Sequence, residues 1–208
     1  MVDIIIQIPV LLLSVIVHEI AHGYAALKLG DGTAKEMNRL TLNPIPHIDL
    51  VWSIIIPGIL ILSQSQFLIG GAKPVPIDPR NFKDPRKGMM IVSVAGPLSN
   101  FILAIISSIL FKILNGMEPS YGSYGFITLK LLLYACVINI VLGVFNLIPI
   151  PPLDGSKILL GLLPPRMAYA YSMIEQYGFI IIILLLFTNM LPRILGFFCN
   201  PLLKLLLG

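Results

Sequence analysis

Residues 4–29 read IIIQIPVLLLSVIVHEIAHGYAALKL, a run long enough to cross a lipid bilayer as one helix. The run is apolar on every side except for the cluster His18-Glu19-Ile20-Ala21-His22. No basic region precedes the run and no small-residue cleavage site follows it. We therefore expect a retained helix over Ile4–Leu29 and not a signal peptide.

The rest of the chain has the same apolar character. Hydrophobic residues make up 57% of the 208 residues, charged residues make up 12%, and the mean hydropathy is +0.93. Average soluble proteins carry about 25% charged residues. The 14 basic and 10 acidic side chains cannot cover the surface of a soluble fold of this size. Disordered chains are poor in apolar residues, so the composition also excludes disorder. With a soluble fold and disorder both excluded, we expect an all-α polytopic membrane protein.

Four more apolar segments could enter the membrane, which gives about five to six transmembrane helices together with a re-entrant segment. These segments are 51–69, 89–114, 126–148 and 177–207. The last segment is cut by Pro192-Arg193. It forms either one span plus a surface helix or two short spans.

The placement of charge bears on the topology of these segments. Two basic loops, roughly 30–49 and 70–88, flank segment 51–69, whereas the loop 115–125 contains no Lys or Arg. Because Lys and Arg favour cytoplasmic loops, both basic loops should lie on one side of the membrane. We therefore favour a re-entrant segment over a crossing one at 51–69, where Pro57-Gly58 interrupts the run. We also allow for a short β-strand region before the third apolar span.

Two acidic side chains lie inside apolar segments or at their irregular ends, Glu19 and Asp154. A charge at such depth is costly and marks a functional site by default. His18 and His22 are four residues apart, so both imidazoles project from one face of a helix. That spacing suits two nitrogen ligands of a tetrahedral Zn²⁺. Glu19 lies between them, as the general base does in the H-E-x-x-H pattern of zinc hydrolases.

Asp154 is a candidate for the third protein ligand. It follows the proline-rich break at 149–153, where the helix unwinds and a carboxylate can be aimed inward. The depths also agree, since His22 lies six residues before Lys28 and Asp154 lies three residues before Lys157. Two alternatives remain. Asp154 is the N-cap of the helix that follows it, or the polar groups form a hydrogen-bonded cluster between helices without a metal.

Two motifs occur together in this chain: His18-Glu19-x-x-His22 in a membrane helix, and Asn146-Leu147-Ile148-Pro149-x-Pro151-Pro152-Leu153-Asp154-Gly155 much later. Their combination resembles the site-2 protease family of intramembrane zinc metalloproteases, peptidase family M50. Further stretches resemble the compact branch of that family, which lacks PDZ and CBS domains. They are Gly30-Asp31-Gly32-Thr33-Ala34, Arg39-Leu40-Thr41-Leu42-Asn43-Pro44, Ala72-Lys73-Pro74-Val75-Pro76 and Ala95-Gly96-Pro97-Leu98-Ser99-Asn100. The resemblance covers nearly the whole chain up to about Leu163.

The resemblance implies one Zn²⁺ per chain with three protein ligands: His18, His22 and Asp154. It implies that Glu19 activates a water molecule. It also suggests that Asn146 contacts the substrate backbone or the developing oxyanion, and that Asn100 helps in the same way. We expect Gly70–Pro76, together with the re-entrant segment, to pair with an unwound substrate as an added strand.

The function implied by the resemblance is a zinc metalloendopeptidase that hydrolyses peptide bonds within or near transmembrane segments of membrane-protein substrates. We expect a multi-pass protein in the lipid bilayer of a prokaryotic cytoplasmic membrane, with the active site nearer the cytoplasmic side. A single domain should cover 1–208. Its catalytic core should lie at about 4–163 and its C-terminal helices at about 170–207.

One stretch departs from the family pattern. His47-Ile48-Asp49-Leu50-Val51-Trp52 stands where relatives tend to place Pro and Gly after the Asp. The departure bears on the start of segment 51–69 and not on the zinc site. His47 itself is most simply an interfacial histidine, and a metal ligand or a gate residue are the alternatives.

The alternative function is a metal-ion transporter or channel whose path is lined by the same His, Glu and Asp side chains. The compact grouping of these residues favours an enzyme, because a transport path needs ionisable groups spread across the bilayer. Nucleic acid is not an expected partner, since eight of the 14 Lys and Arg cluster beside apolar segments, between Lys28 and Lys87. A non-catalytic scaffold is disfavoured because Glu19 would then have no purpose.

Overall fold

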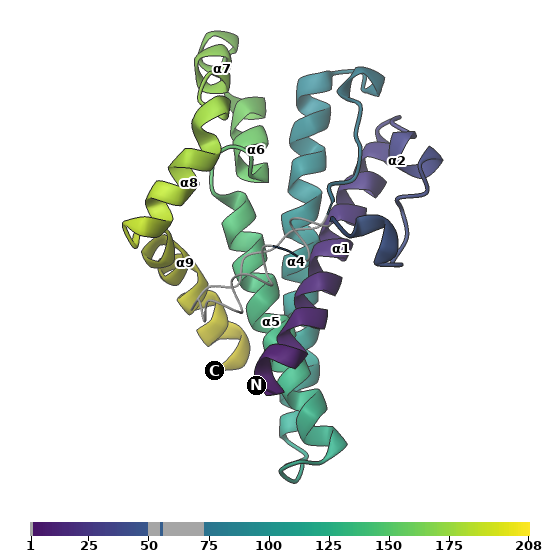
Figure 1. The fold of residues 1–208 in the computed structure, drawn as a ribbon, viewed down its shortest axis with the longest axis vertical. Coiled ribbons are helices and arrows are strands. Elements are labelled where there is room, and N and C mark those ends of the chain that lie inside the picture. Colours follow the sequence, from purple (N-terminus) through teal and green to yellow (C-terminus); the bar gives the residue numbers. More distant parts are fainter. Residues whose placement is uncertain (1, 50–54, 56–72) are drawn as a thin grey trace.

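The chain is helical in a computed structural model that describes residues 2–49, 55 and 73–208 (Figure 1). The long helices are α1 (Val2–Lys28), α4 (Pro85–Asn115), α5 (Tyr124–Leu147) and α9 (Met190–Leu207). The shorter elements are α2 (Thr33–Glu36), η1 (Ile45–His47), η3 (Pro79–Asn81), α6 (Asp154–Leu162), α7 (Pro165–Ser172), η4 (Glu175–Tyr177) and α8 (Gly178–Phe187). No strand occurs in the described ranges, so the residues 73–84 before α4 form a loop and a 3₁₀ turn.

Five helical stretches among the described residues are long and apolar enough to cross a membrane. They are 5–28, 85–115, 124–147, 165–187 and 190–207. This finding confirms the predicted all-α polytopic membrane protein with about five to six spanning helices. The predicted re-entrant segment 51–69 lies outside the described residues, apart from residue 55.

The end of the chain folds as two helices, α8 and α9. They are separated at Asn189, whose backbone adopts the left-handed conformation with a φ of 55°. A residue in this conformation ends a helix, so the apolar block cannot continue as a single rod. The stretches 165–187 and 190–207, on the two sides of Asn189, qualify as spans by length and composition. The chain therefore ends in two candidate spans, but the first begins at residue 165 and not near residue 177.

The core of the bundle is formed by α1, α4 and α5, which pack side by side, while α6 lies against α4 and α9 leans on α5 (Figure 1). A buried apolar cluster joins α4, α5 and α9. Its members are Ala104, Cys136, Ile140, Val144 and Cys199. Small residues bring the helices close, as at Gly143, where an added Cβ would stand 3.0 Å from Cζ of Phe101.

A chain of polar side chains crosses this apolar interior. Asn100 donates from Nδ2 to Oδ1 of Asn139 at 2.8 Å, and Asn139 donates from Nδ2 to Oγ of Ser14 at 2.8 Å. Ser14 in turn donates to the carbonyl of Val10 at 2.7 Å. Such bonds between membrane helices contribute about 0.6–2 kcal/mol each. They hold α1, α4 and α5 in one register.

Gly96 on α4 faces the two histidines of α1. A Cβ at this position would overlap Nε2 of His22 and would stand 2.6 Å from Cε1 of His18. Because real Cβ contacts do not occur at such distances, only glycine allows α4 to approach α1 this closely at the level of the imidazoles. The position of both rings therefore depends on the missing side chain.

We expect Gly96→Ala to displace the imidazoles and to lower the zinc content of the purified protein well below one ion per chain. Overpacking of this kind typically costs about 1–3 kcal/mol, so thermal unfolding in detergent should also occur at a lower temperature. Gly116→Ala is the control, because the nearest atom to its added Cβ is 3.5 Å away. Full zinc content and unchanged melting of Gly96→Ala would contradict this prediction.

Candidate active site

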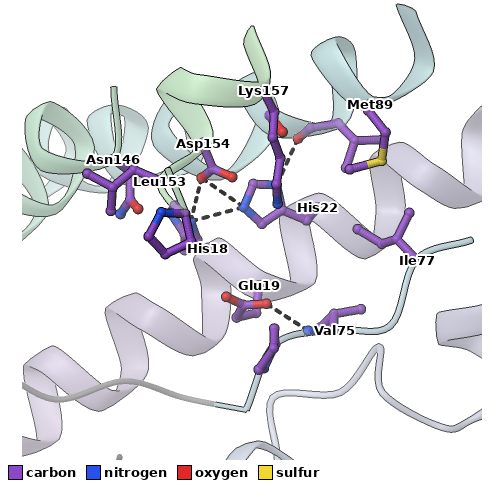
Figure 2. A pocket seen from close by; sticks show the side chains of 14 residues that line it. His18, Glu19, His22, Val75, Ile77, Met89, Asn146, Leu153, Asp154 and Lys157 are labelled. Carbon is purple, nitrogen blue, oxygen red and sulfur yellow. Dashed lines mark hydrogen bonds and ion pairs between the residues drawn. The ribbon is translucent and has the colours of Figure 1, made fainter. Parts of the chain in front are cut away.

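Three side chains from two helices converge in the interior of the bundle. His18 and His22 project from one face of α1, and Asp154 reaches them from the first residue of α6 (Figure 2). The two Nε2 atoms are 3.0 Å apart, and each lies 3.1 Å from Oδ2 of Asp154. All three residues are buried, with 6–7% of their surface exposed.

The outer nitrogen of each imidazole is held by an oxygen. Nδ1 of His18 lies 2.6 Å from Oδ1 of Asn100, and Nδ1 of His22 lies 2.7 Å from the carbonyl oxygen of Val92. Both oxygens are acceptors, so each Nδ1 is protonated and donates a hydrogen bond. In a neutral ring, Nε2 is then unprotonated and carries a lone pair. Oδ2 of Asp154 has no hydrogen-bond partner in the described part of the chain. Three lone pairs therefore face one another.

Such a triangle of acceptors is repulsive without a cation at its centre. A proton on one Nε2 could form a hydrogen bond with only one of the other two ligand atoms and would leave the remaining contacts repulsive. Protons on both Nε2 atoms would create two adjacent imidazolium ions, which repel each other. A tetrahedral Zn²⁺ with bonds of about 2.0–2.1 Å separates its ligand atoms by about 3.3 Å. The spacing of 3.0–3.1 Å found here is close to that value. The residues present thus fit zinc, and three protein ligands leave the open position that catalytic zinc sites require.

The local backbone explains how Asp154 reaches the histidines. Pro149, Pro151 and Pro152 have no N–H groups, so α5 ends at Leu147 and the chain turns before α6. Helix α6 begins at Asp154 itself, and no side chain caps it. The N-cap alternative is therefore wrong.

Glu19 lies next to His18 on α1 and lines the same pocket as the three ligands. Its Oε2 accepts a hydrogen bond from the backbone N–H of Val75 at 2.8 Å. Figure 2 shows the carboxylate between the histidine pair and the segment that carries Val75. The pocket encloses about 180 Å³, which leaves room for a water molecule and a peptide group beside the ligands.

The two asparagines expected at the substrate lie in different places. Asn146 lines the pocket from the last turn of α5, and its Nδ2 donates to the carbonyl of Leu142 at 3.0 Å. Asn100 is fully buried behind His18 and does not belong to the described pocket lining. Asn146 therefore lies at the wall of the pocket, whereas Asn100 lies outside the described lining and contacts Nδ1 of His18.

His47 lies apart from the three ligands. It is fully buried, and its Nε2 forms a hydrogen bond with the carbonyl of Thr41 at 2.9 Å. The candidate metal cluster of the described chain does not include it. Its backbone carbonyl accepts the N–H of Lys73 at 2.8 Å, so His47 helps to position the segment that leads to Val75.

The expected strand pairing at 70–76 can be compared with the structure only from Lys73 onward, because residues 70–72 are not described. The N–H groups of Lys73 and Val75 both donate within the protein, and Pro74 and Pro76 have none. This part of the chain therefore has no free N–H group to offer a substrate strand.

Two contacts of the site could not be found from residue types, because backbone atoms make them. The carbonyl of Val92 orients His22, and the N–H of Val75 contacts Glu19. The triplet Pro74-Val75-Pro76 was the available signal for the second contact, since it retains a single N–H group. Lys157 also lines the pocket, although the sequence alone indicates only that it lies near Asp154 in depth.

Comparison with known proteins gives the same class. Residues 123–188 match the model of peptidase family M50. YwhC of Bacillus subtilis is 42% identical over 184 residues, which cover 86% of this chain and 78% of that protein. Rip2 of Mycolicibacterium smegmatis is 31% identical over 182 residues, which cover 88% of this chain and 66% of that protein. A zinc metalloprotease of Methanocaldococcus jannaschii is 28% identical over 166 residues, which cover 78% of this chain and 35% of that protein.

The names of YwhC and Rip2 assign both proteins provisionally to the zinc metalloproteases. No solved structure matches the chain at a significant level. The chain belongs to peptidase family M50. It is a zinc metalloprotease with a multi-pass membrane fold, which confirms the predicted enzyme class and the predicted Zn²⁺ cofactor.

Replacing Asn100 by alanine should weaken zinc binding, because the change removes the acceptor that holds Nδ1 of His18. Loss of such a partner typically lowers metal affinity by about 10- to 100-fold. Competition with a chelator of known zinc affinity measures the effect on detergent-solubilised protein. Asn115→Ala, at the exposed end of the same helix, is the control. Equal zinc affinity of the two variants would contradict an orienting role for Asn100.

Proposed function

We propose that this metalloprotease hydrolyses peptide bonds within or near transmembrane segments of membrane-protein substrates. The supporting observation is the depth of the site. His18, Glu19 and His22 lie inside the spanning stretch 5–28 of α1, and their neighbour α4 is also long and apolar enough to span. A pocket at this depth meets peptide segments that are themselves inside the membrane.

Each residue of the pocket has a proposed role. His18, His22 and Asp154 would hold Zn²⁺, which lowers the pKa of water and polarises a carbonyl group when it is bound. Glu19 accepts the proton of the attacking water on Oε1 and returns it to the leaving amine nitrogen. Its Oε2 remains on the N–H of Val75.

The two asparagines act in different ways in this proposal. Asn146 presents an amide donor to the developing oxyanion from the wall of the pocket, and such a donor is worth about 2.7–4 kcal/mol. Asn100 acts through His18, because its Oδ1 accepts a hydrogen bond from the Nδ1–H of His18 and so fixes the ring orientation. Asn139 and Ser14 hold Asn100 in turn.

A metal transporter would use the same groups as steps along an ion path. The ligand atoms of the cluster all lie within 4.8 Å of one another, which is the spacing of a single site. Within the described residues, no second group of three such ligands extends the site toward either end of the bundle. The geometry therefore favours hydrolysis over transport.

We place the pocket nearer the cytoplasmic side of a prokaryotic cell membrane. Lys28 at the end of α1 and Arg86-Lys87 at the start of α4 lie at one end of the bundle (Figure 1). The loop 116–123 lies at the opposite end and contains no Lys or Arg (Figure 1). Positive charge favours the cytoplasm, and His22 lies near the positive end.

We treat the chain as one domain over 1–208. Its catalytic core, at about 4–163, includes every residue to which a role is assigned here. The C-terminal helices, at about 170–207, pack against α5 through Cys199 and its neighbours and contribute nothing to the described pocket lining. Their proposed role is to support the core.

Glu19→Gln should reduce cleavage without loss of zinc. Glutamine has nearly the same shape and can still accept the hydrogen bond from Val75. It cannot take up a proton at neutral pH, and a general base is worth about 10²–10⁴ in rate. The purified proteins are assayed in detergent for zinc content and for cleavage of a peptide that contains a transmembrane segment. Glu36→Gln, on the exposed face of α2, is the matched control.

Equal cleavage by Glu19→Gln and the wild-type protein would overturn the proposed function. Zinc flux into proteoliposomes by a wild-type protein that cleaves no transmembrane peptide would support the transporter instead. Loss of cleavage in Glu19→Gln, with zinc content and the Glu36→Gln control unchanged, is the expected result.

A further inference from the structure

The segment Lys73–Asp78, which we call the strap, runs past the pocket beside Glu19 (Figure 2). At its centre is the triplet Pro74-Val75-Pro76, whose two prolines have no N–H group and a fixed φ. The N–H of Val75 is therefore the one backbone donor of the triplet, and it donates to Oε2 of Glu19 at 2.8 Å. Val75 is 5% exposed, so this contact is shielded from water.

Arg39 holds the strap just ahead of Val75. Its Nη2 donates to the carbonyl of Lys73 at 2.7 Å and to the carbonyl of Pro74 at 3.3 Å. Arg39 is buried, and its Nε has no hydrogen-bond partner in the described part of the chain. Burying a guanidinium costs free energy unless its N–H groups find acceptors. Among the described residues, the two strap carbonyls are the acceptors that the side chain of Arg39 contacts, so they keep it in place.

Asp31 holds the strap at its other end. Its Oδ2 accepts the N–H of Asp78 at 2.8 Å, and its Oδ1 accepts Nδ2 of Asn81 at 2.8 Å. Oδ1 also accepts the N–H and the hydroxyl of Thr33. Asp31 comes three residues after the end of α1, and its own N–H donates to the carbonyl of Ala26 in that helix at 2.9 Å. Burial raises the pKa of Asp31, but these bonds lower that pKa overall, so the carboxylate is ionised.

We propose that Arg39 and Asp31 are positioning residues for hydrolysis, because they hold the strap so that the N–H of Val75 fixes the carboxylate of Glu19. This inference rests on the proposed role of Glu19 as the general base. With Oε2 held, the carboxylate cannot rotate freely, and Oε1 keeps one direction into the pocket. A base must stand within hydrogen-bond reach of the attacking water, and a misplacement of about 1 Å costs about 100-fold in rate.

The two anchors act through the strap and not on the substrate. Neither Arg39 nor Asp31 belongs to the described lining of the pocket. Asp31 is attached to the end of the same helix that carries Glu19, so the strap and the base share one rigid support. The stretches at 30–34 and 39–44 thereby acquire a role at the zinc site although they lie outside the pocket.

The direct test removes the N–H group of Val75. Val75→Pro deletes this donor, and Val75→Ala trims the side chain but keeps the donor. With the full chain in detergent and a transmembrane peptide as substrate, we expect Val75→Pro to lower kcat by about 10- to 100-fold, with KM and zinc content near the wild-type values. Val75→Ala should retain most of the kcat that Val75→Pro loses.

A second pair of variants tests the anchor itself. Arg39→Gln cannot reach both strap carbonyls, whereas the ammonium group of Arg39→Lys can donate to both. We expect Arg39→Gln to lower kcat while zinc content stays at one ion per chain, and we expect Arg39→Lys to restore most of that loss. Arg166→Gln, on the exposed surface of α7, serves as the charge-matched control with unchanged kcat.

If Glu19→Gln is inactive while Val75→Pro and Arg39→Gln both keep the wild-type kcat, this inference fails and the proposed function stands. If Glu19→Gln cleaves as well as wild type, the proposed function itself fails. Should Val75→Pro lose zinc or fail to fold, the Arg39 pair decides. A loss in Arg39→Gln that Arg39→Lys does not restore, or that comes with loss of zinc, overturns the positioning role.

Discussion

Three lone pairs that face one another without a proton are the constraint on which the rest of this structure depends. Nε2 of His18, Nε2 of His22 and Oδ2 of Asp154 converge in an apolar interior, where an unpaired polar group costs on the order of several kcal/mol. A divalent cation at the centre would attract all three atoms, so the free energy of metal binding would also stabilise the fold around the site. The groups must therefore be held in position by contacts that do not involve the metal.

Those contacts lie on the far side of the imidazoles. The carbonyl of Val92 and Oδ1 of Asn100 accept hydrogen bonds from the Nδ1–H groups. Asn139 and Ser14 continue the polar chain from α4 through α5 to α1. Water would compete for such groups on a protein surface, but hydrocarbon cannot, so the same hydrogen bonds specify one arrangement of the helices. Gly96 completes the arrangement from the packing side, because any side chain there would occupy the space of the rings.

The kind of atom that makes each contact decides what could be predicted from the sequence. Ionisable groups at helical spacing in an apolar run are conspicuous, so the sequence could single out the candidate ligands and the candidate base, and run length was sufficient to predict that several helices span the membrane. The carbonyl of Val92 and the N–H of Val75 are groups that nearly every residue has, so residue type carries no signal for them. The sequence groups Asn100 with Asn146, but Asn100 lies outside the described pocket lining and contacts His18. The sequence indicates how deep a residue lies along its helix, but not which way its side chain points. The break at Asn189 depends on one left-handed residue.

The pocket is assembled on α1, and its other parts have attachments of their own. Helix α6, which carries Asp154, is held on α4 by Arg86, whose Nε donates to the carbonyl of Leu160 at 2.7 Å. The strap is held by Arg39 and by Asp31. Because each part is anchored outside the pocket, the position of Asp154 and the position of the strap depend on different contacts. The two histidines share one helix, so their spacing is set by α1 alone.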